Sequence, residues 1–190
     1  MMTLRRIAFP SLLLGLVSLA SCAQPNSQSR GFARLNVIAW DETDVKLSAL
    51  GYSETGESEH DSIELGGGIS HWDSGGFKQS SLEVLLGVSE FYEVDAIELS
   101  GGGRFYFGQN EIVRPYGAMH GVLTMLDDDL GSQLGIRAGV GSELAVGSSV
   151  FLDMNLNYLL PVIPAEDDVT GLLESEIDGM SLRVGVGIDF

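Results

Sequence analysis

The chain has 190 residues, enough for one domain with a sizeable core, and its formal net charge of -17 argues against nucleic acid as a partner because the basic footprint is missing. Its single cysteine excludes an internal disulfide, and beyond the N-terminus no apolar run is long enough for a transmembrane helix. With 25 glycines, 5 prolines and a mean hydropathy of +0.18, the composition favours an antiparallel barrel over a helical bundle.

The N-terminus predicts an export signal rather than part of the fold. Two arginines precede an apolar stretch over 7–17, the arrangement of a secretory signal peptide. The four residues at 19–22, Leu-Ala-Ser-Cys, resemble a bacterial lipobox. This resemblance implies a signal peptide over 1–21 and lipidation of Cys22, and we interpret 22–30 as a polar tether. An ordinary secretory signal with an incidental cysteine is the alternative.

Most of the remaining chain alternates apolar and polar residues with a period of two, which predicts strands with one apolar and one polar face. In the first strand, Arg34 and Trp40 fall on the same face, and the faces of the fifth strand cannot be assigned because its alternation is weak. In chain order, the expected strands are 32–40 with a continuation over 45–49, then 63–72, 82–89, 97–107, 114–125, 134–141, 150–160 and 180–190.

The connections between these strands fall into two kinds. Those over 41–61, 90–95, 126–132 and 161–179 are acidic and mostly long, and we expect them to be loops. Those over 73–79, 108–113 and 145–149 carry fewer acidic residues and are mostly shorter. Long loops at one end and short turns at the other are typical of membrane barrels with about eight strands of about ten residues.

Three segments carry a resemblance to a known family: Arg-Phe-Tyr-Phe at 104–107, Arg-Pro-Tyr-Gly-Ala at 114–118, and the alternating stretch at 182–190. Over 31–190 the sequence resembles the small eight-stranded outer-membrane β-barrels of the OmpA-like type. The resemblance implies an all-β, eight-stranded antiparallel up-and-down barrel of the transmembrane type, located in the Gram-negative outer membrane, in contact with its lipid. It also implies a C-terminal β-signal that the barrel assembly machinery reads, carried by Val184, Val186, Ile188 and Phe190.

Charged residues recur on the polar faces of the expected strands. A narrow eight-stranded barrel is filled by side chains, and buried charges must pair, so we expect a charge-paired network in the lumen rather than a charge-lined pore. Because only three arginines face many carboxylates, some carboxylates are expected to lie near water at a barrel end or to have raised pKa values. The members of this network are Glu64, Glu83, Glu98, Arg104, Arg137, Glu143, Asp153, Arg183 and Asp189.

No motif indicates an enzyme, a metal site or a cofactor. The acidic runs 127–129 and 166–168 lack the spaced ligands of a calcium loop. His60, His71 and His120 are accompanied by no nucleophile motif, and the glycine-rich stretches lie inside strands with no following helix. We therefore expect no catalytic residue, no metal and no cofactor.

Two functional hypotheses remain. The first is a non-catalytic outer-membrane barrel, lipid-anchored through Cys22, with a structural or surface-interaction role; its transport variant is a minor solute pore. The second is a lipid-anchored soluble barrel of the periplasm with an apolar interior that binds a small apolar ligand. Period-two alternation alone cannot separate them. The terminal Phe190, the loop asymmetry and the glycines on the polar faces favour the membrane barrel.

Overall fold

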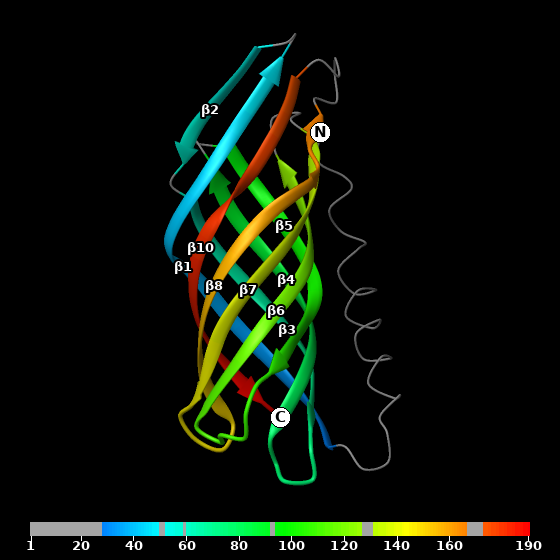
Figure 1. Ribbon diagram of the computed structural model, residues 1–190, viewed down its shortest axis with the longest axis vertical. Helices are drawn as coiled ribbons and strands as arrows, with labels where there is room; N and C mark the ends of the chain where they lie inside the picture. The colour runs from blue at the N-terminus through cyan, green and yellow to red at the C-terminus, as the bar shows by residue number, and fades with distance from the viewer. Residues whose placement is uncertain (1–27, 50–51, 59, 92–93, 127–130, 167–172) are drawn as a thin grey trace, which may run out of the picture.

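A computed structural model describes residues 28–49, 52–58, 60–91, 94–126, 131–166 and 173–190 of the chain (Figure 1). Cys22, the expected signal peptide and the acidic run at 127–129 lie outside these residues. Within the described part no helix is long and apolar enough to cross a membrane. The strands are β1 (Gln28–Ala49), β2 (Tyr52–Ser58), β3 (His60–Trp72), β4 (Lys78–Phe91), β5 (Val94–Tyr106), β6 (Val113–Leu126), β7 (Ser132–Ala145), β8 (Val150–Ile163), β9 (Ala165–Glu166) and β10 (Leu173–Asp189).

The strands form one antiparallel sheet that closes on itself. Its order is β2-β1-β3-β4-β5-β6-β7-β8-β10-β9, and β1 also pairs with β10 from Phe32↔Asp189 to Ala49↔Leu173. The short strands β2 and β9 pair only beyond the ring, so the ring itself contains the other eight strands. The predicted all-β, eight-stranded antiparallel barrel is confirmed.

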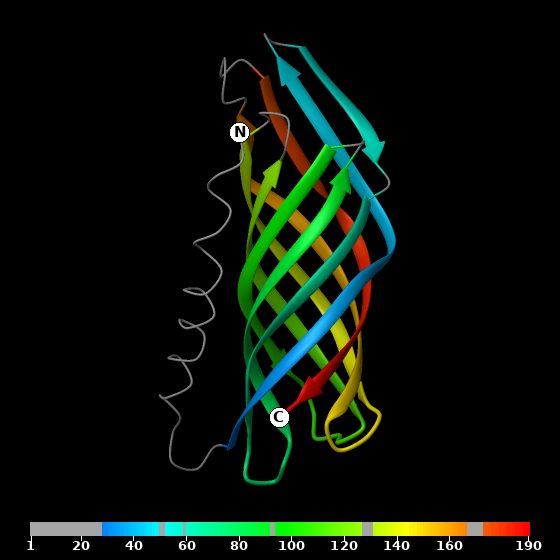
Figure 2. The same cartoon turned by 180° about the vertical axis from the view of Figure 1, so that it is seen from behind.

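The two ends of the barrel differ, as Figures 1 and 2 show. The connections β3–β4, β5–β6 and β7–β8 lie together at the end that also holds the C-terminus, which we call the turn end. In the first of these turns the Asp73 carboxylate accepts hydrogen bonds from the backbone N–H groups of Gly75 and Phe77, both 2.9 Å. At the opposite end, the loop end, β1, β2 and β10 extend past the other strands (Figures 1 and 2).

Side chains alternate between the two faces of the wall. Along β8 the even-numbered residues from Val150 to Leu160 are exposed, and the odd-numbered ones from Phe151 to Leu159 are buried. The outside is apolar: Leu152, for example, is 46% exposed. The inside is polar, with Asp153 and the asparagines at 155 and 157 buried. The alternative of a soluble barrel with an apolar interior is therefore wrong.

The pairings of the ring strands show three register shifts, and two of them change the faces of residues considered in the sequence. Between Ile38 and Trp40 the β1–β10 register shifts by one residue, which reverses the faces of the rest of the strand. Trp40, expected on the face of Arg34, is instead on the outside and 45% exposed. At the turn end, a register shift between His71 and Trp72 places Lys78 opposite Trp72 and buries it.

β1 continues to Ala49, in agreement with the expected continuation over 45–49. Two stretches expected to be loops contain strands instead: β2 returns along β1 within 51–61, and β10 begins at Leu173 within 161–179. Here the pairing of β1 with both β2 and β10 satisfies the backbone of segments whose acidic side chains disfavour strands. Residues 28–30, expected in the tether, also belong to β1 and pair with β3.

Candidate functional site: the charged barrel interior

All nine charged residues expected in the lumen are buried, each at most 7% exposed. The wall positions them because they occupy inward-facing positions of the ring strands. They come from six strands: Glu64 on β3, Glu83 on β4, Glu98 and Arg104 on β5, Arg137 and Glu143 on β7, Asp153 on β8, and Arg183 and Asp189 on β10.

The group nearest the loop end joins two arginines to two glutamates. Arg137 donates to Glu64 Oε1 at 2.9 Å and to both carboxylate oxygens of Glu98 at 3.0 and 2.9 Å. Arg183 also donates to Glu64. The Asn36 amide donates to the second Glu64 oxygen at 3.3 Å. Two buried cations therefore neutralise two buried anions, and the pairing satisfies the condition for burying them.

The middle group is built around Asp153 and Glu83. Arg104 donates to both oxygens of Asp153, at 3.1 and 2.9 Å, and its Nε donates to Glu83 at 3.0 Å. Arg34 donates to the same two carboxylates, at 2.9 Å each. Tyr116 donates its hydroxyl to Asp153 at 2.6 Å, and His120 Nε2 lies 2.6 Å from Glu83 Oε1.

The group at the turn end surrounds Glu143. Lys78 Nζ lies 3.0 Å from one Glu143 oxygen and 3.5 Å from Asp189 Oδ1. Tyr106 donates its hydroxyl to Glu143 at 2.5 Å. Arg104 reaches Glu143 as well, at 3.2 Å, and so links this group to the middle one.

The interior charges balance. Among the described residues, six buried carboxylates face five buried Arg and Lys side chains, and the half-buried Arg114, which lies 3.8 Å from both Glu143 and Asp189, is the sixth. The expectation that carboxylates outnumber cations is therefore wrong. Arg34, Lys78 and Arg114 supply the three positive charges that sequence reasoning left out.

The sequence contained a usable indication for some of the interior residues that were not predicted, but not for others. Arg34 lies on the polar face of the first expected strand, so its parity could have placed it in the network. Lys78 left no signal, because the bulge beside Gln79 reverses its face. Tyr116 and His120 lie on β6, where small and apolar residues occupy both faces and mask the alternation.

Aromatic rings close the turn end of the lumen. The Lys78 ammonium lies 4.8 Å from the ring centre of Phe151, 5.1 Å from that of Tyr106 and 5.2 Å from that of Phe32. The side chain of Lys78 is fully buried, with 0% relative exposure. Cation–π attraction of this kind adds to the ion pairs and holds the ammonium in place.

An apolar layer closes the loop end. Ala96, Val122, Leu159 and Ile177 form a buried cluster inside the barrel, and Val45 and Leu126 pack against it. Beside this layer β8 no longer pairs with β10, and the Gln133 side chain replaces the missing strand. It donates to the Ile177 carbonyl at 2.8 Å and accepts from the Ile177 N–H at 2.7 Å.

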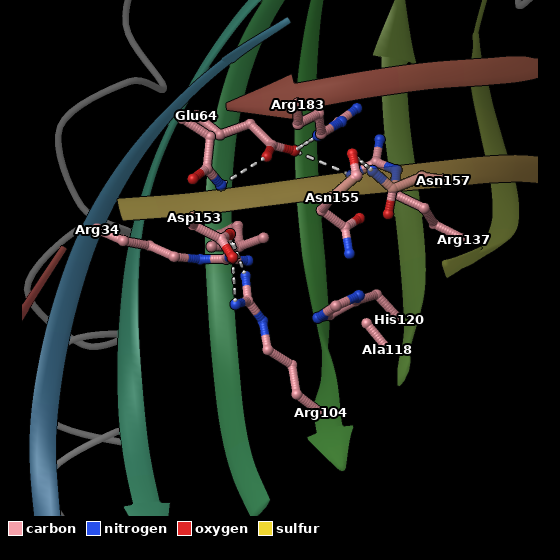
Figure 3. A pocket seen from close by; sticks show the side chains of 12 residues that line it. Arg34, Glu64, Arg104, Ala118, His120, Arg137, Asp153, Asn155, Asn157 and Arg183 are labelled. Carbon is pink, nitrogen blue, oxygen red and sulfur yellow. Dashed lines mark hydrogen bonds and ion pairs between the residues drawn. The ribbon is translucent and has the colours of Figure 1, made fainter. Parts of the chain in front are cut away.

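Little free space remains between the charged groups. A cavity of about 10 Å³ is lined by residues of the middle and loop-end groups, among them Arg34, Asn155 and Arg183 (Figure 3). A site of this size holds about one water molecule. Arg34 Nε and Asn155 Nδ2 are buried without a protein partner. This cavity can therefore hold water, and the paired side chains of the described residues fill the lumen around it.

Within the described residues, no group of His, Cys, Asp and Glu could hold a metal ion. The Ser29 hydroxyl lies 3.1 Å from His71 Nδ1, and no carboxylate is bonded to His71 in this part of the chain. A hydrolytic triad needs such a carboxylate to orient the imidazole.

The four residues of the expected β-signal lie on β10 and at the C-terminus. Of these, Val186, Ile188 and Phe190 are exposed on the outside of the barrel.

No protein-family model matches the sequence, and no curated protein matches it either. Solved structures do match. The structure of Neisserial surface protein A aligns over 86% of this chain and 99% of its own, with a TM-score of 0.57 and 15% identity. Outer membrane protein AlkL, solved in lipid bilayers, aligns over 88% and 93%, with a TM-score of 0.56 and 15% identity.

The N-terminal β-barrel domain of Pseudomonas aeruginosa OprF aligns over 86% of this chain and 100% of its own, with a TM-score of 0.52 and 14% identity. At such identities the similarity concerns the fold. Together with the closed ring, the apolar exterior and the charged interior, it leads to one conclusion. The chain is an all-β, closed eight-stranded antiparallel barrel that resembles the transmembrane barrels of outer-membrane proteins.

Proposed function

We propose that this protein is a non-catalytic barrel of the Gram-negative outer membrane with a closed lumen and a structural or surface-interaction role. The observation that carries the proposal is the distribution of charge across the wall: apolar side chains outside, and six carboxylates paired with six cations inside. In water the exposed apolar side chains would be unfavourable, whereas in lipid they meet hydrocarbon.

The exposed aromatic residues support a membrane location as well. Trp40 and Tyr158 lie on the outside towards the loop end, and Phe105, Phe107 and Phe190 lie on the outside at the turn end. Aromatic side chains favour both membrane–water interfaces. We place the turn end in the periplasm and the loop end, with its acidic extension, outside the cell.

The lumen closure supports a role other than transport. The aromatic cluster around Lys78, the paired charges and the apolar layer around Ile177 lie one after another along the barrel. A solute would have to break buried ion pairs to pass, at a cost of about 3–5 kcal/mol for each. A minor solute pore is therefore the less favoured hypothesis.

The N-terminus and the C-terminus complete the proposal. Residues 1–21 would be removed as a signal peptide, Cys22 would carry the lipid anchor, and 31–190 would form the barrel domain. The barrel assembly machinery would read the C-terminal segment that contains Val184, Val186, Ile188 and Phe190. Incorporation of labelled palmitate into the wild-type chain, and its loss in Cys22→Ser, tests the anchor separately from the barrel.

The experiment that tests the barrel uses the full chain expressed in a Gram-negative cell. We expect it in the detergent-extracted outer-membrane fraction, with a gel mobility in SDS that changes only after boiling. Purified protein reconstituted in planar bilayers should add no steady conductance. Recovery in the soluble fraction after Cys22→Ser, with no heat-dependent shift, would contradict the membrane barrel. A steady conductance together with a normal heat-dependent gel shift would contradict the closed lumen and support the minor solute pore.

A further inference from the structure

The loop-end extension is a small sheet of its own. From Thr43 to Ala49, β1 pairs on one side with β10 and on the other with β2. Outward-facing residues at this end of β1, namely Glu42, Asp44 and Lys46, are charged, whereas those nearer the middle of the strand, such as Val37, are apolar. The extension therefore lies beyond the apolar belt and, if the proposed function holds, projects from the cell surface.

One edge of this sheet is unpaired. Among the described strands, β2 pairs with β1 alone and stands at the end of the strand order. Two residues separate the paired residues Ala49 and Tyr52. In a hairpin with a two-residue connection the closing pair is hydrogen-bonded, and the pairs alternate from there. The backbone N–H and C=O groups of Ser53, Thr55 and Glu57 consequently point away from β1, towards the free edge.

The charged side chains of the extension determine which kind of strand can pair with the free edge of β2. Residues 41–61 include seven Asp or Glu and one Lys, and 173–178 include three further acidic residues. The register places Asp44 and Asp178 side by side across β1 and β10. Like charges directly opposite one another in a sheet are destabilising, and a cation nearby relieves them.

The one lysine of the extension, Lys46, is already paired with a carboxylate. Lys46 Nζ lies 2.9 Å from Glu176 Oε2. This hydrogen bond and the charge of Glu176 raise the pKa of Lys46 above its usual value. The acidic residues of the extension outnumber its one lysine, so the extension can attract further cations from a binding partner.

We propose that the free edge of β2 binds an extended, lysine- or arginine-rich segment of a partner protein as an additional strand. The backbone groups of 53, 55 and 57 would supply the hydrogen bonds, in the manner of strand addition at a sheet edge. Acidic side chains such as Glu54, which is exposed, would supply the preference for a cationic segment. The proposal deepens the surface-interaction role and rests on it for the side of the membrane on which the partner is found.

A second copy of this chain is the occupant that the charges disfavour. Pairing of two β2 edges would bring the acidic β2 of one molecule, which includes the exposed Glu54, against the same strand of the other. Acidic side chains on an edge strand prevent such self-association. The same charges attract a cationic strand, so the edge discriminates between the two kinds of partner.

The test uses the full chain refolded in uncharged detergent micelles and synthetic peptides of about nine residues, the length of a typical strand. The probe alternates Thr and Lys; a second peptide has the same charge with proline at its centre, and a third alternates Thr and Glu. The protein variant is Thr55→Pro, which removes an edge N–H without removing a bond to β1. Thr55→Val is its matched control.

We expect the Thr-Lys peptide to bind and the Thr-Glu peptide not to bind. Thr55→Pro and the proline peptide should each weaken binding about tenfold or more, because each removes backbone hydrogen bonds at the new interface. Thr55→Val should bind as the wild type does, and Glu54→Gln should bind less tightly. Absence of binding would overturn the proposal. It would also be overturned if the proline peptide on the wild type and the Thr-Lys peptide on Thr55→Pro bound as tightly as the Thr-Lys peptide on the wild type. That result would indicate non-specific electrostatic binding to the acidic side chains.

The failures of the two proposals can be told apart. Peptide binding in micelles does not depend on where the protein resides in the cell. The heat-dependent gel shift and the fractionation do not depend on β2. A normal gel shift with no peptide binding would therefore reject the strand-addition site alone.

Discussion

Arg104 on β5 and Asp153 on β8 are joined across the barrel interior by two hydrogen bonds, of 3.1 and 2.9 Å. The same guanidinium reaches Glu83 and Glu143. The arginine fork fits a carboxylate with two parallel bonds, which a lysine cannot do. Arg104 therefore links the middle of the network to the turn end.

Arg104→Met should destabilise the folded barrel by about 3–5 kcal/mol, because it leaves buried carboxylates without their cation. Urea unfolding in lipid vesicles, followed by tryptophan fluorescence, measures the change. The double variant Arg104→Met, Asp153→Asn removes one of the stranded charges and should cost less than the sum of the two single variants. Strict additivity would show that the two residues do not act as a pair.

Leu156→Arg should cost about 2–4 kcal/mol, whereas Val150→Arg on the same strand should cost about 0–1 kcal/mol, because the penalty for an arginine in lipid falls towards the interface. Leu156 is exposed near the middle of β8 opposite Leu182, and Val150 is exposed at the turn end. Val184→Arg should behave like Leu156→Arg. Unfolding in vesicles measures all three, and equal costs at Leu156 and Val150 would contradict a membrane-spanning β8.

Gly102→Ala should destabilise the barrel by about 1–3 kcal/mol, the usual cost of overpacking. A Cβ at Gly102 would lie 2.1 Å from the carbonyl oxygen of Met119, which belongs to the backbone and cannot swing away. The neighbouring Gly101→Ala is the control. Its Cβ would face outward and lie 3.9 Å from the nearest atom, Val84 Cγ2, so we expect no loss. Equal unfolding midpoints for the two variants would argue against close inner packing at this point.

Gln133→Leu should cost about 1–3 kcal/mol, because it leaves the buried N–H and C=O of Ile177 without partners. Hydrogen exchange resolved by NMR should show faster exchange of the Ile177 amide while amides in the middle of β8 keep their protection. Ser132→Ala, at the exposed neighbouring position, serves as the control. Unchanged exchange at Ile177 would mean that another group closes this gap.

The amino-acid sequence alone was sufficient for the number of strands in the ring and for sorting most residues onto the two faces of each strand. The reason is that the side-chain period of a strand is two, so any residue in a regular strand shares its face with residues two positions away. Phe151, Asp153 and Asn155 illustrate this: their shared parity places them inside the barrel, where the structure has them. The nine charged residues that the sequence placed in the interior were found in the same way, whereas Arg34, Lys78 and Arg114 were not.

The faces changed by bulges could not be predicted. One inserted residue near Ile38 moves Trp40 to the outside, and another at Gln79 moves Lys78 to the inside. A bulge depends on how two strands register with each other, which one strand's own pattern does not record. β2 and the first part of β10 were missed for a related reason: these strands form because β1, β2 and β10 satisfy one another's backbone groups.

The sequence by itself thus determined that the chain forms antiparallel strands with one apolar and one charged face, because alternation is a local property of each strand. Only the tertiary structure decided that the charged face lies inside and that the interior is neutral and closed. Charge balance and closure depend on which side chains meet across the lumen, and partners such as Arg34 and Asp153, 119 residues apart in the chain, meet only when β1 pairs with β10 and the ring closes.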